Sequence, residues 1–292
     1  MIGMRKSIWA ATLVTAGFLV GTVASAQTPP PGTPPATPAQ GDKSQAPVQP
    51  LTLDNAAPPV NAEEDVAIKA YREAPMEDST AVTKKLQLGE DFLTKYPQSR
   101  YRSEVLSWQV RGYLGVGQVD KMEAAGEKEL AMQPNDAQTM AIMGSALPRS
   151  IGYTMTADQK TKVLDEAEKY CKQALELVPT IPKPAGITDE QFVAAKNQVQ
   201  AMAYSGLGLV AFRRGKFAEA IPNLEQAIKY DPNPDPVNFL ILGISNEKSS
   251  HFDDAVTAFT KCAAIQSSLA ATCKNGIEEA KKLGSTQLSV PK

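Results

Sequence analysis

Residues 204–232 read YSGLGLVAFRRGKFAEAIPNLEQAIKYDP, and this stretch decides the fold. A second stretch, residues 239–262, reads FLILGISNEKSSHFDDAVTAFTKC and follows the same pattern 35 residues later. In both, an alanine follows the glycine of a Leu-Gly pair after 12 residues, and a large apolar residue follows that alanine after 4. An ordinary helical bundle is the alternative, but small, large and helix-breaking residues that recur in register favour a repeated unit.

Each unit is expected to be a pair of short antiparallel helices with an apolar face that one pair cannot bury alone. Gly208 stands where the first helix must approach the second closely, opposite Ala220, and Leu224 would fill the space between units. Gly215 ends the first helix, because glycine turns the chain easily through positive φ. Pro232 ends the second helix, because proline has no N–H to continue it.

This pattern resembles the tetratricopeptide repeat, a unit of ~34 residues with a Leu-Gly pair, a central alanine and a closing proline. The resemblance implies an all-α, right-handed solenoid of antiparallel helix pairs that acts as a binding scaffold. We expect clear repeats at residues 201–234 and 236–268, degenerate repeats across residues 61–187, and a C-terminal capping helix at residues 269–284. Together they form one solenoid over residues 61–292.

The earlier part of the solenoid shows weaker copies of the unit. Glu63, Glu64 and Asp65 crowd a first helical turn, where acidic residues suit the helix dipole. Residues 92–101, FLTKYPQSRY, resemble the joint between repeats in envelope tetratricopeptide proteins, including outer-membrane assembly and cell-division factors. Residues 129–134 parallel the end of the clear repeat, Ala227 to Pro232.

The third unit carries an insertion. Its helices are expected at residues 136–146 and 157–177, with a loop of residues 148–156 between them. Such a loop lies either on a binding face or on a neutral surface. A long helix, residues 189–214, follows a proline-rich joint.

The N-terminal 60 residues have a different composition. Residues 1–26 combine Arg5 and Lys6, an apolar run and an Ala24-Ser25-Ala26 end, which predicts a secretory signal peptide; an uncleaved membrane anchor is the alternative. The proline-rich residues 27–60 predict a disordered linker, or alternatively a proline-rich ligand for another domain. We therefore expect an exported protein, periplasmic or secreted, of the bacterial cell envelope.

Motifs for chemistry are almost missing from the sequence. The single histidine, His251, lies in a turn, so a Ser-His-Asp triad or a multi-histidine metal site is not expected. The glycines of Gly206-Leu207-Gly208 lie within a helix and are packing residues, not a phosphate-binding loop. We expect no catalytic residues, no metal and no cofactor, although the sequence leaves a carboxylate pair open. A formal net charge of −2 gives no reason to expect nucleic acid.

Three cysteines in an exported protein allow one disulfide. Cys262 lies late in one helix and Cys273 early in the next, so this pair is expected to face each other, leaving Cys171 in a different repeat. The alternative is three buried thiols that act as small apolar residues.

In the family that the repeat resembles, one stripe of each first helix lines a concave binding face. The matching residues of the degenerate repeat are Ser107 and Arg111. Polar clamp residues for acidic peptide ends would be expected near Ser205, Leu209 and Ile241, so an extended or helical partner segment with apolar anchors is favoured. The alternative is that these residues pack against the next helix. The expected partner-binding residues are Met202, Ser205, Leu209, Phe212, Arg213, Val237, Leu240, Ile244 and Lys248.

The sequence therefore predicts a non-enzymatic scaffold that binds another protein or peptide and has no stable membrane insertion after signal cleavage. A structural spacer or assembly factor, anchored by an uncleaved N-terminal helix, is the alternative function.

Overall fold

The computed structural model describes residues 62–288, with side chains to residue 286. The sequence-based expectations for residues 1–26 and 27–60 lie outside this range. Within it the chain forms eleven α-helices, one short 3-10 helix and no strand, so the all-α class is confirmed. The helices are α1 (Ala62–Glu73), α2 (Ser79–Lys95), α3 (Arg102–Gly115), α4 (Val119–Met132), α5 (Ala137–Ser150), α6 (Ala157–Leu177), η1 (Val178–Thr180), α7 (Asp189–Arg213), α8 (Phe217–Tyr230), α9 (Pro236–Lys248), α10 (Phe252–Ala264) and α11 (Ala270–Leu288).

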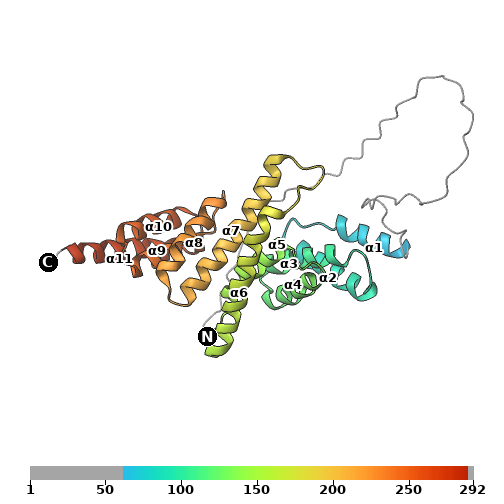
Figure 1. Cartoon of the computed structure of the whole chain (residues 1–292), viewed down its shortest axis with the longest axis horizontal. Coiled ribbons are helices and arrows are strands. Elements are labelled where there is room, and N and C mark those ends of the chain that lie inside the picture. The colour runs from blue at the N-terminus through green and yellow to red at the C-terminus, as the bar shows by residue number, and fades with distance from the viewer. Residues whose placement is uncertain (1–61, 289–292) are drawn as a thin grey trace, which may run out of the picture. The chain divides into compact units, whose positions relative to one another are not determined.

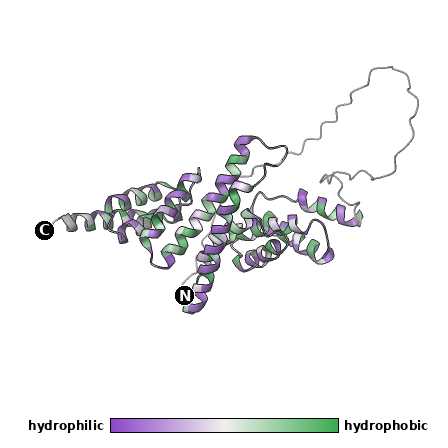
Figure 2. Ribbon diagram, in the orientation of Figure 1, coloured by the Kyte–Doolittle hydropathy of each residue, from purple (hydrophilic) through white to green (hydrophobic). Residues whose placement is uncertain are grey.

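Helices that follow one another in the chain pack as pairs (Figure 1). The closest pairs are α3 with α4, α5 with α6, α7 with α8, and α9 with α10, while α11 packs on α10. The first helix of each later pair also contacts the pair before it, as α7 contacts both α5 and α6. Most helices carry apolar and polar residues together (Figure 2), which suits elements that bury one face against a neighbour.

The small-residue positions of the repeat are tight contacts, as the sequence predicts. A Cβ atom on Gly208 would lie 2.6 Å from Cγ of Leu224, and one on Gly243 would lie 2.5 Å from Cδ1 of Phe259. Ala220, the small residue of α8, is fully buried. The turn after α7 has Gly215 at a φ of 74°, which confirms the role expected for this glycine.

A tight backbone contact joins α5 to α7. A Cβ atom on Gly206 would lie 2.7 Å from the backbone oxygen of Gly144. The thiol of Cys171, from α6, fills the remaining space beside both glycines. Gly144, Gly206 and Cys171 therefore form a three-helix contact that accepts no larger side chain at either glycine.

The insertion in the third unit differs from the expectation. Helix α5 does not end at Ala146 but continues through Pro148 to Ser150, so only residues 151–156 form the loop. Proline lacks the N–H that would bond the oxygen of Gly144, yet α5 continues for two residues beyond Pro148, which is buried. The loop exposes Tyr153 completely.

The long helix α7 has the length that the sequence predicts. Its second half forms the first helix of the repeat, and its first half extends toward η1. There Val199 packs with Val178 of η1, whereas Val193 is 54% exposed. Among residues 62–288, none of the helices combines the length and the apolar character needed to cross a membrane.

Candidate functional site

The expected binding stripe follows one side of α7 and α9, and the structure divides its nine residues into three groups. Two are buried, four are partly buried in core clusters, and three lie at the ends of α7 and α9, where Phe212 is also partly buried against a core cluster and Arg213 and Lys248 are exposed. The division matters because only accessible side chains can contact a partner without unfolding the repeat.

Ser205 and Leu209 are buried, so the expectation that they line a groove is wrong. The hydroxyl of Ser205 donates to Oδ1 of Asn238 at 2.7 Å, which joins α7 to α9. Leu209 is 3% exposed and packs with Leu224 and Ile241. Ile241 is the remaining position at which a polar clamp residue would have been expected, and it is buried as well. The alternative, that these residues pack against the next helix, is the correct one here.

An ion pair between residues far apart in the chain also connects helices in this part of the stack. Nη1 of Arg149, near the end of α5, lies 2.9 Å from Oδ2 of Asp235, the residue that caps the start of α9. These residues are 86 positions apart in the chain and come from the helices on the two sides of α7. The extension of α5 past Pro148 places Arg149 where it can form this pair.

The partly buried residues contact the core through their apolar atoms. Met202 packs against one cluster built from α2 to α5 and another built from α5, α6, η1 and α7, and Val237 packs against the cluster that holds α8 and α9 together. Leu240 and Ile244 pack in a cluster that includes Ile277 of α11. The C-terminal helix thus covers part of the surface that these two α9 residues would offer to a partner.

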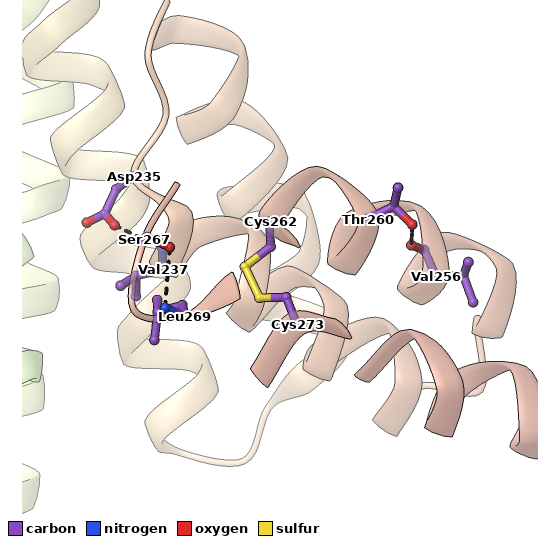
Figure 3. The surroundings of a disulfide bond; sticks show 8 residues. All are labelled: Asp235, Val237, Val256, Thr260, Cys262, Ser267, Leu269 and Cys273. Atoms are coloured by element: carbon purple, nitrogen blue, oxygen red, sulfur yellow. Dashed lines mark hydrogen bonds between the residues drawn. A yellow bond between two sulfur atoms is a disulfide. The ribbon is translucent and has the colours of Figure 1, made fainter. Parts of the chain in front are cut away.

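Helix α11 is fixed there by a disulfide (Figure 3). Cys262 of α10 and Cys273 of α11 are bonded, with their Cα atoms 5.9 Å apart, and both side chains are fully buried. Cys171 is free and buried, and burial raises the pKa of its thiol to about 12. This is the pairing that the sequence indicates, with Cys171 as a packing residue.

Three expected residues remain at the edge of the stack, and with Phe217 they form what we call the Phe212 edge: Phe212, Arg213, Phe217 and Lys248. The ring of Phe212 meets the ring of Phe217 edge-on, with 5.7 Å between centroids. Phe217 and Lys248 line an open hollow of about 340 Å³ between the α7–α8 turn and the end of α9. Arg213 is exposed and has no ion pair among the described residues.

The other cations of this edge are paired with carboxylates. Nζ of Lys216 lies 3.1 Å from Oε1 of Glu219, and Nζ of Lys248 lies 3.5 Å from Oε1 of Glu247. Arg213 is therefore the cation that a partner carboxylate can reach without breaking an existing pair. An apolar pair of rings beside an unpaired guanidinium suits a peptide with an apolar anchor and an acidic group.

The residues expected from the degenerate repeat, Ser107 and Arg111, are both half-buried. The guanidinium of Arg111 donates to Oε1 of Gln138 at 2.9 Å and lies 4.6 Å from the ring centroid of Trp108. Burial lowers its pKa. Nζ of Lys85 lies 4.9 Å from the same ring, so Trp108 is in contact with two cations. Arg111 thus links α3 to α5 instead of standing free on the binding face.

A buried carboxylate, which the sequence analysis did not identify, lies on α4. Glu129 is 2% exposed; one oxygen accepts a hydrogen bond from Ser103 at 2.7 Å, and the other oxygen has no partner. Burial raises the pKa of this carboxyl. The burial of Glu129 could have been predicted from the sequence, because Glu129 occupies the position of the buried Ala227 in the clear repeat.

The single histidine lies in the turn that the sequence indicates. His251 is exposed and immediately precedes α10, and its side chain makes no capping hydrogen bond to that helix. No group of three or more histidine, cysteine, aspartate or glutamate side chains that could hold a metal ion occurs in residues 62–286.

Taken together, stacked helix pairs with glycine contacts in register define a protein of the helical-repeat class. Residues 201–234 match the family model described as Tetratricopeptide repeat, so the repeat predicted at these residues is confirmed. No curated protein matches the chain.

Two solved structures are similar to this chain at low identity. One is TTC0263, a thermophilic TPR protein of Thermus thermophilus, with 18% identity and a TM-score of 0.46 over 75% of this chain and 96% of that one. The other is PilW, described as a widely conserved type IV pilus biogenesis factor, with 16% identity and a TM-score of 0.46 over 79% of this chain and 96% of that one.

Proposed function

We propose that this protein is a non-enzymatic scaffold that binds a segment of another protein at the Phe212 edge. The observation that carries the proposal is that Arg213 and Lys248 are exposed at the ends of α7 and α9, where the half-buried rings of Phe212 and Phe217 meet and where Phe217 and Lys248 line an open hollow. The tetratricopeptide repeat at residues 201–234 supports the general role, because this class of repeat typically presents a surface for binding other proteins.

The partner segment fits the chemistry of this edge. An apolar side chain would pack against the rings of Phe212 and Phe217, and a carboxylate would pair with Arg213. The proposal is narrower than the sequence-based one, because Leu240 and Ile244 are engaged with α11 and no longer count as anchors.

Site-specific cross-linking in native cells tests where the partner lies. A photoreactive residue placed at Phe212 should capture a partner protein, whereas one placed at Val193, which is exposed on the same helix, should not. Equal capture at both positions, or none at Phe212, contradicts the proposal.

Binding measurements with the captured partner then separate affinity from stability. Phe212→Ala should weaken binding by about 1–3 kcal/mol, and Arg213→Ala should weaken it less and in a salt-dependent way. Leu209→Ala is the matched control, because a buried residue should lower the melting temperature without changing the affinity of the folded molecules. A Phe212→Ala variant that melts early yet binds normally contradicts the proposal.

We also propose that the protein is exported to the bacterial cell envelope. The basic start, apolar run and Ala24-Ser25-Ala26 sequence support export, and the Cys262–Cys273 disulfide suits an oxidising compartment. The mass of the native protein tests this point. A chain that begins at Gln27 supports release, while one that begins at Met1 supports the anchored alternative.

A further inference from the structure

One face of α3 carries a polar stripe that the proposed partner binding does not use. Glu104, Ser107, Trp108 and Arg111 stand at positions i, i+3, i+4 and i+7, so they share one face of the helix. All four residues are partly exposed, and side chains of α1, α2 and α5 reach them. The stripes of α7 and α9, by contrast, consist mainly of apolar residues that pack in core clusters. The face of α3 is thus a place where polar groups of four helices come together.

Two cations from different helices lie against the ring of Trp108. Nζ of Lys85, from α2, is 4.9 Å from the ring centroid, and the guanidinium carbon of Arg111 is 4.6 Å from it. Nζ of Lys85 also donates to the backbone oxygens of Arg72 and Ala74 at the end of α1, each at 3.3 Å. Neither cation forms an ion pair with a carboxylate among the described residues, and burial lowers the pKa of both. Two positive charges are therefore partly removed from water without a partner of opposite charge.

Three carboxylates lie near these two cations, but other groups engage them. Glu104 accepts two hydrogen bonds from Arg72, from Nε at 2.7 Å and from Nη2 at 2.6 Å. Glu129 accepts from Ser103, and its other oxygen is buried. Asp136 accepts from two backbone N–H groups at the start of α5. The acceptors that could neutralise the two cations are therefore used elsewhere.

Hydrogen-bond donors, by contrast, remain open beside Trp108. Nη1 of Arg111 donates to Oε1 of Gln138 at 2.9 Å, which fixes the direction of the guanidinium. Nη2 of Arg111, the hydroxyl of Ser107 and the amide nitrogen of Gln138 have no hydrogen-bond partner among the described residues, and none of these atoms is sealed from solvent. A guanidinium and an amide nitrogen only donate. The open groups therefore suit a ligand group that only accepts.

We propose that these five residues, which we call the Trp108 cluster, bind a carboxylate: Lys85, Ser107, Trp108, Arg111 and Gln138. An ionised carboxylate has acceptor sites only, and its two oxygens match parallel N–H groups of an arginine. Its charge would neutralise the two cations, and the contacts that already hold Arg111 leave little freedom to lose on binding. The same group is present in a free organic acid and in an acidic side chain of a protein. The cluster is separate from the Phe212 edge and does not depend on the partner binding proposed there.

The fluorescence of Trp108 measures binding directly in the full chain. The sequence contains two tryptophans, Trp9 and Trp108, so Trp9→Phe leaves Trp108 as the only one. Sodium acetate should change the emission of Trp108 until the change saturates, and sodium chloride at the same ionic strength should not reproduce it.

A short peptide with blocked ends and a single glutamate then distinguishes the two sources of the carboxylate, with the glutamine peptide as its control. Binding of the glutamate peptide about tenfold or more tighter than acetate identifies a protein segment as the ligand. Equal binding of the two identifies a free acid. Either result supports the site, provided that the glutamine peptide does not bind.

Gln138→Glu is the sharpest variant, because it builds a carboxylate into the site. The new oxygen would take the place of the amide oxygen that Arg111 already bonds, so an internal ion pair would exclude the ligand while the fold is kept. The response to acetate should be lost, and the melting temperature should stay the same or rise. This variant therefore separates lost binding from lost folding.

Two arginine variants of α3 complete the test. Arg111→Gln should weaken acetate binding about tenfold or more, because a charged donor is lost. Arg102→Gln is the matched control, because Arg102 lies nine residues earlier in α3, about two and a half turns away and so on the opposite side of the helix. It removes the same charge and should leave binding unchanged.

Three results would overturn the proposal. The first is an equal response of Trp108 to acetate and to chloride. The second is a Gln138→Glu variant that is folded by circular dichroism and still responds to acetate as the parent chain does. The third is an equal loss of binding in Arg102→Gln and Arg111→Gln, which would show that net charge and not the Trp108 cluster attracts the anion.

Discussion

Gly206→Ala should be the most damaging single-methyl change at a helix contact of this protein. The added Cβ would lie 2.7 Å from the backbone oxygen of Gly144 and 2.9 Å from its carbonyl carbon, and it would also meet the thiol of Cys171. A backbone group cannot rotate away as a side chain can, so α5 and α7 must separate. The fully buried Ala141 and Ala203, on the same two helices, would be disturbed with them.

The magnitude follows from two opposing effects. Overpacking a close-packed interior destabilises by about 1–3 kcal/mol, and occasionally more. Alanine regains about 1 kcal/mol over glycine within a helix. Because the obstacle is backbone, we expect the upper end of the first range and therefore a net loss of about 2 kcal/mol in a urea melt followed by circular dichroism.

Two other glycines serve as controls. At Gly208 the obstacle is the side chain of Leu224, which can move, so Gly208→Ala should cost about 1 kcal/mol less than Gly206→Ala. At Gly284 the nearest atom, Cβ of Phe252, would be 3.3 Å away, so Gly284→Ala should be close to neutral. A Gly206→Ala variant as stable as the Gly284→Ala variant would refute the reasoning. So would full recovery in a Cys171→Ala background, because it would show that the thiol and not the backbone was the obstacle.

Other parts of the molecule give three more predictions. Glu129→Gln should stabilise the protein by about 1 kcal/mol at pH 7, because the raised carboxyl pKa means that the folded state buries a charge there at a cost. The gain in stability should disappear as the pH falls below the carboxyl pKa of the unfolded chain. Urea melts that show the same gain at pH 7 and at pH 4 would contradict this prediction. Replacing both Cys262 and Cys273 by serine should destabilise by about 2–3 kcal/mol; non-reducing peptide mapping of the wild type checks the bond itself, and free thiols at both positions would show that the prediction is wrong. Ser250→Gly should stabilise by about 0.5 kcal/mol, because Ser250 has a φ of 65° at the position where Gly215 lies in the preceding repeat; a thermal melt with an unchanged or lower midpoint would count against it.

Local and periodic features were readable from the sequence. The recurrence of Gly208 and Ala220 at a distance of 35 residues predicts a close helix pair, because a side chain at either position would force the helices apart. Helix ends also followed local rules, as at Gly215, where the chain needs positive φ. Pro148 was the exception, because α5 continues past it to Ser150 although proline donates no N–H to the helix.

The accessible surface, by contrast, was decided by contacts between residues far apart in the chain. Leu209 and Ile244 have the same apolar character and spacing that a peptide-binding stripe would have, and their own sequence neighbourhood does not distinguish a groove from a core. Neighbouring helices bury Leu209, and α11 covers Ile244. The burial of Glu129 and the docking of α1 through Arg72 and Glu104 likewise depend on partners in other helices.

The sequence by itself therefore determined the repeat, the helix pairs and the cysteines that meet, because each depends on spacing within one or two helices. Only the tertiary structure decided which side of each helix stays exposed, since a helix shows the same apolar stripe whether a partner or the next helix covers it. The pair formed by Arg149 and Asp235, 86 residues apart, illustrates the reason. Charges at that separation meet only after the intervening helices have stacked.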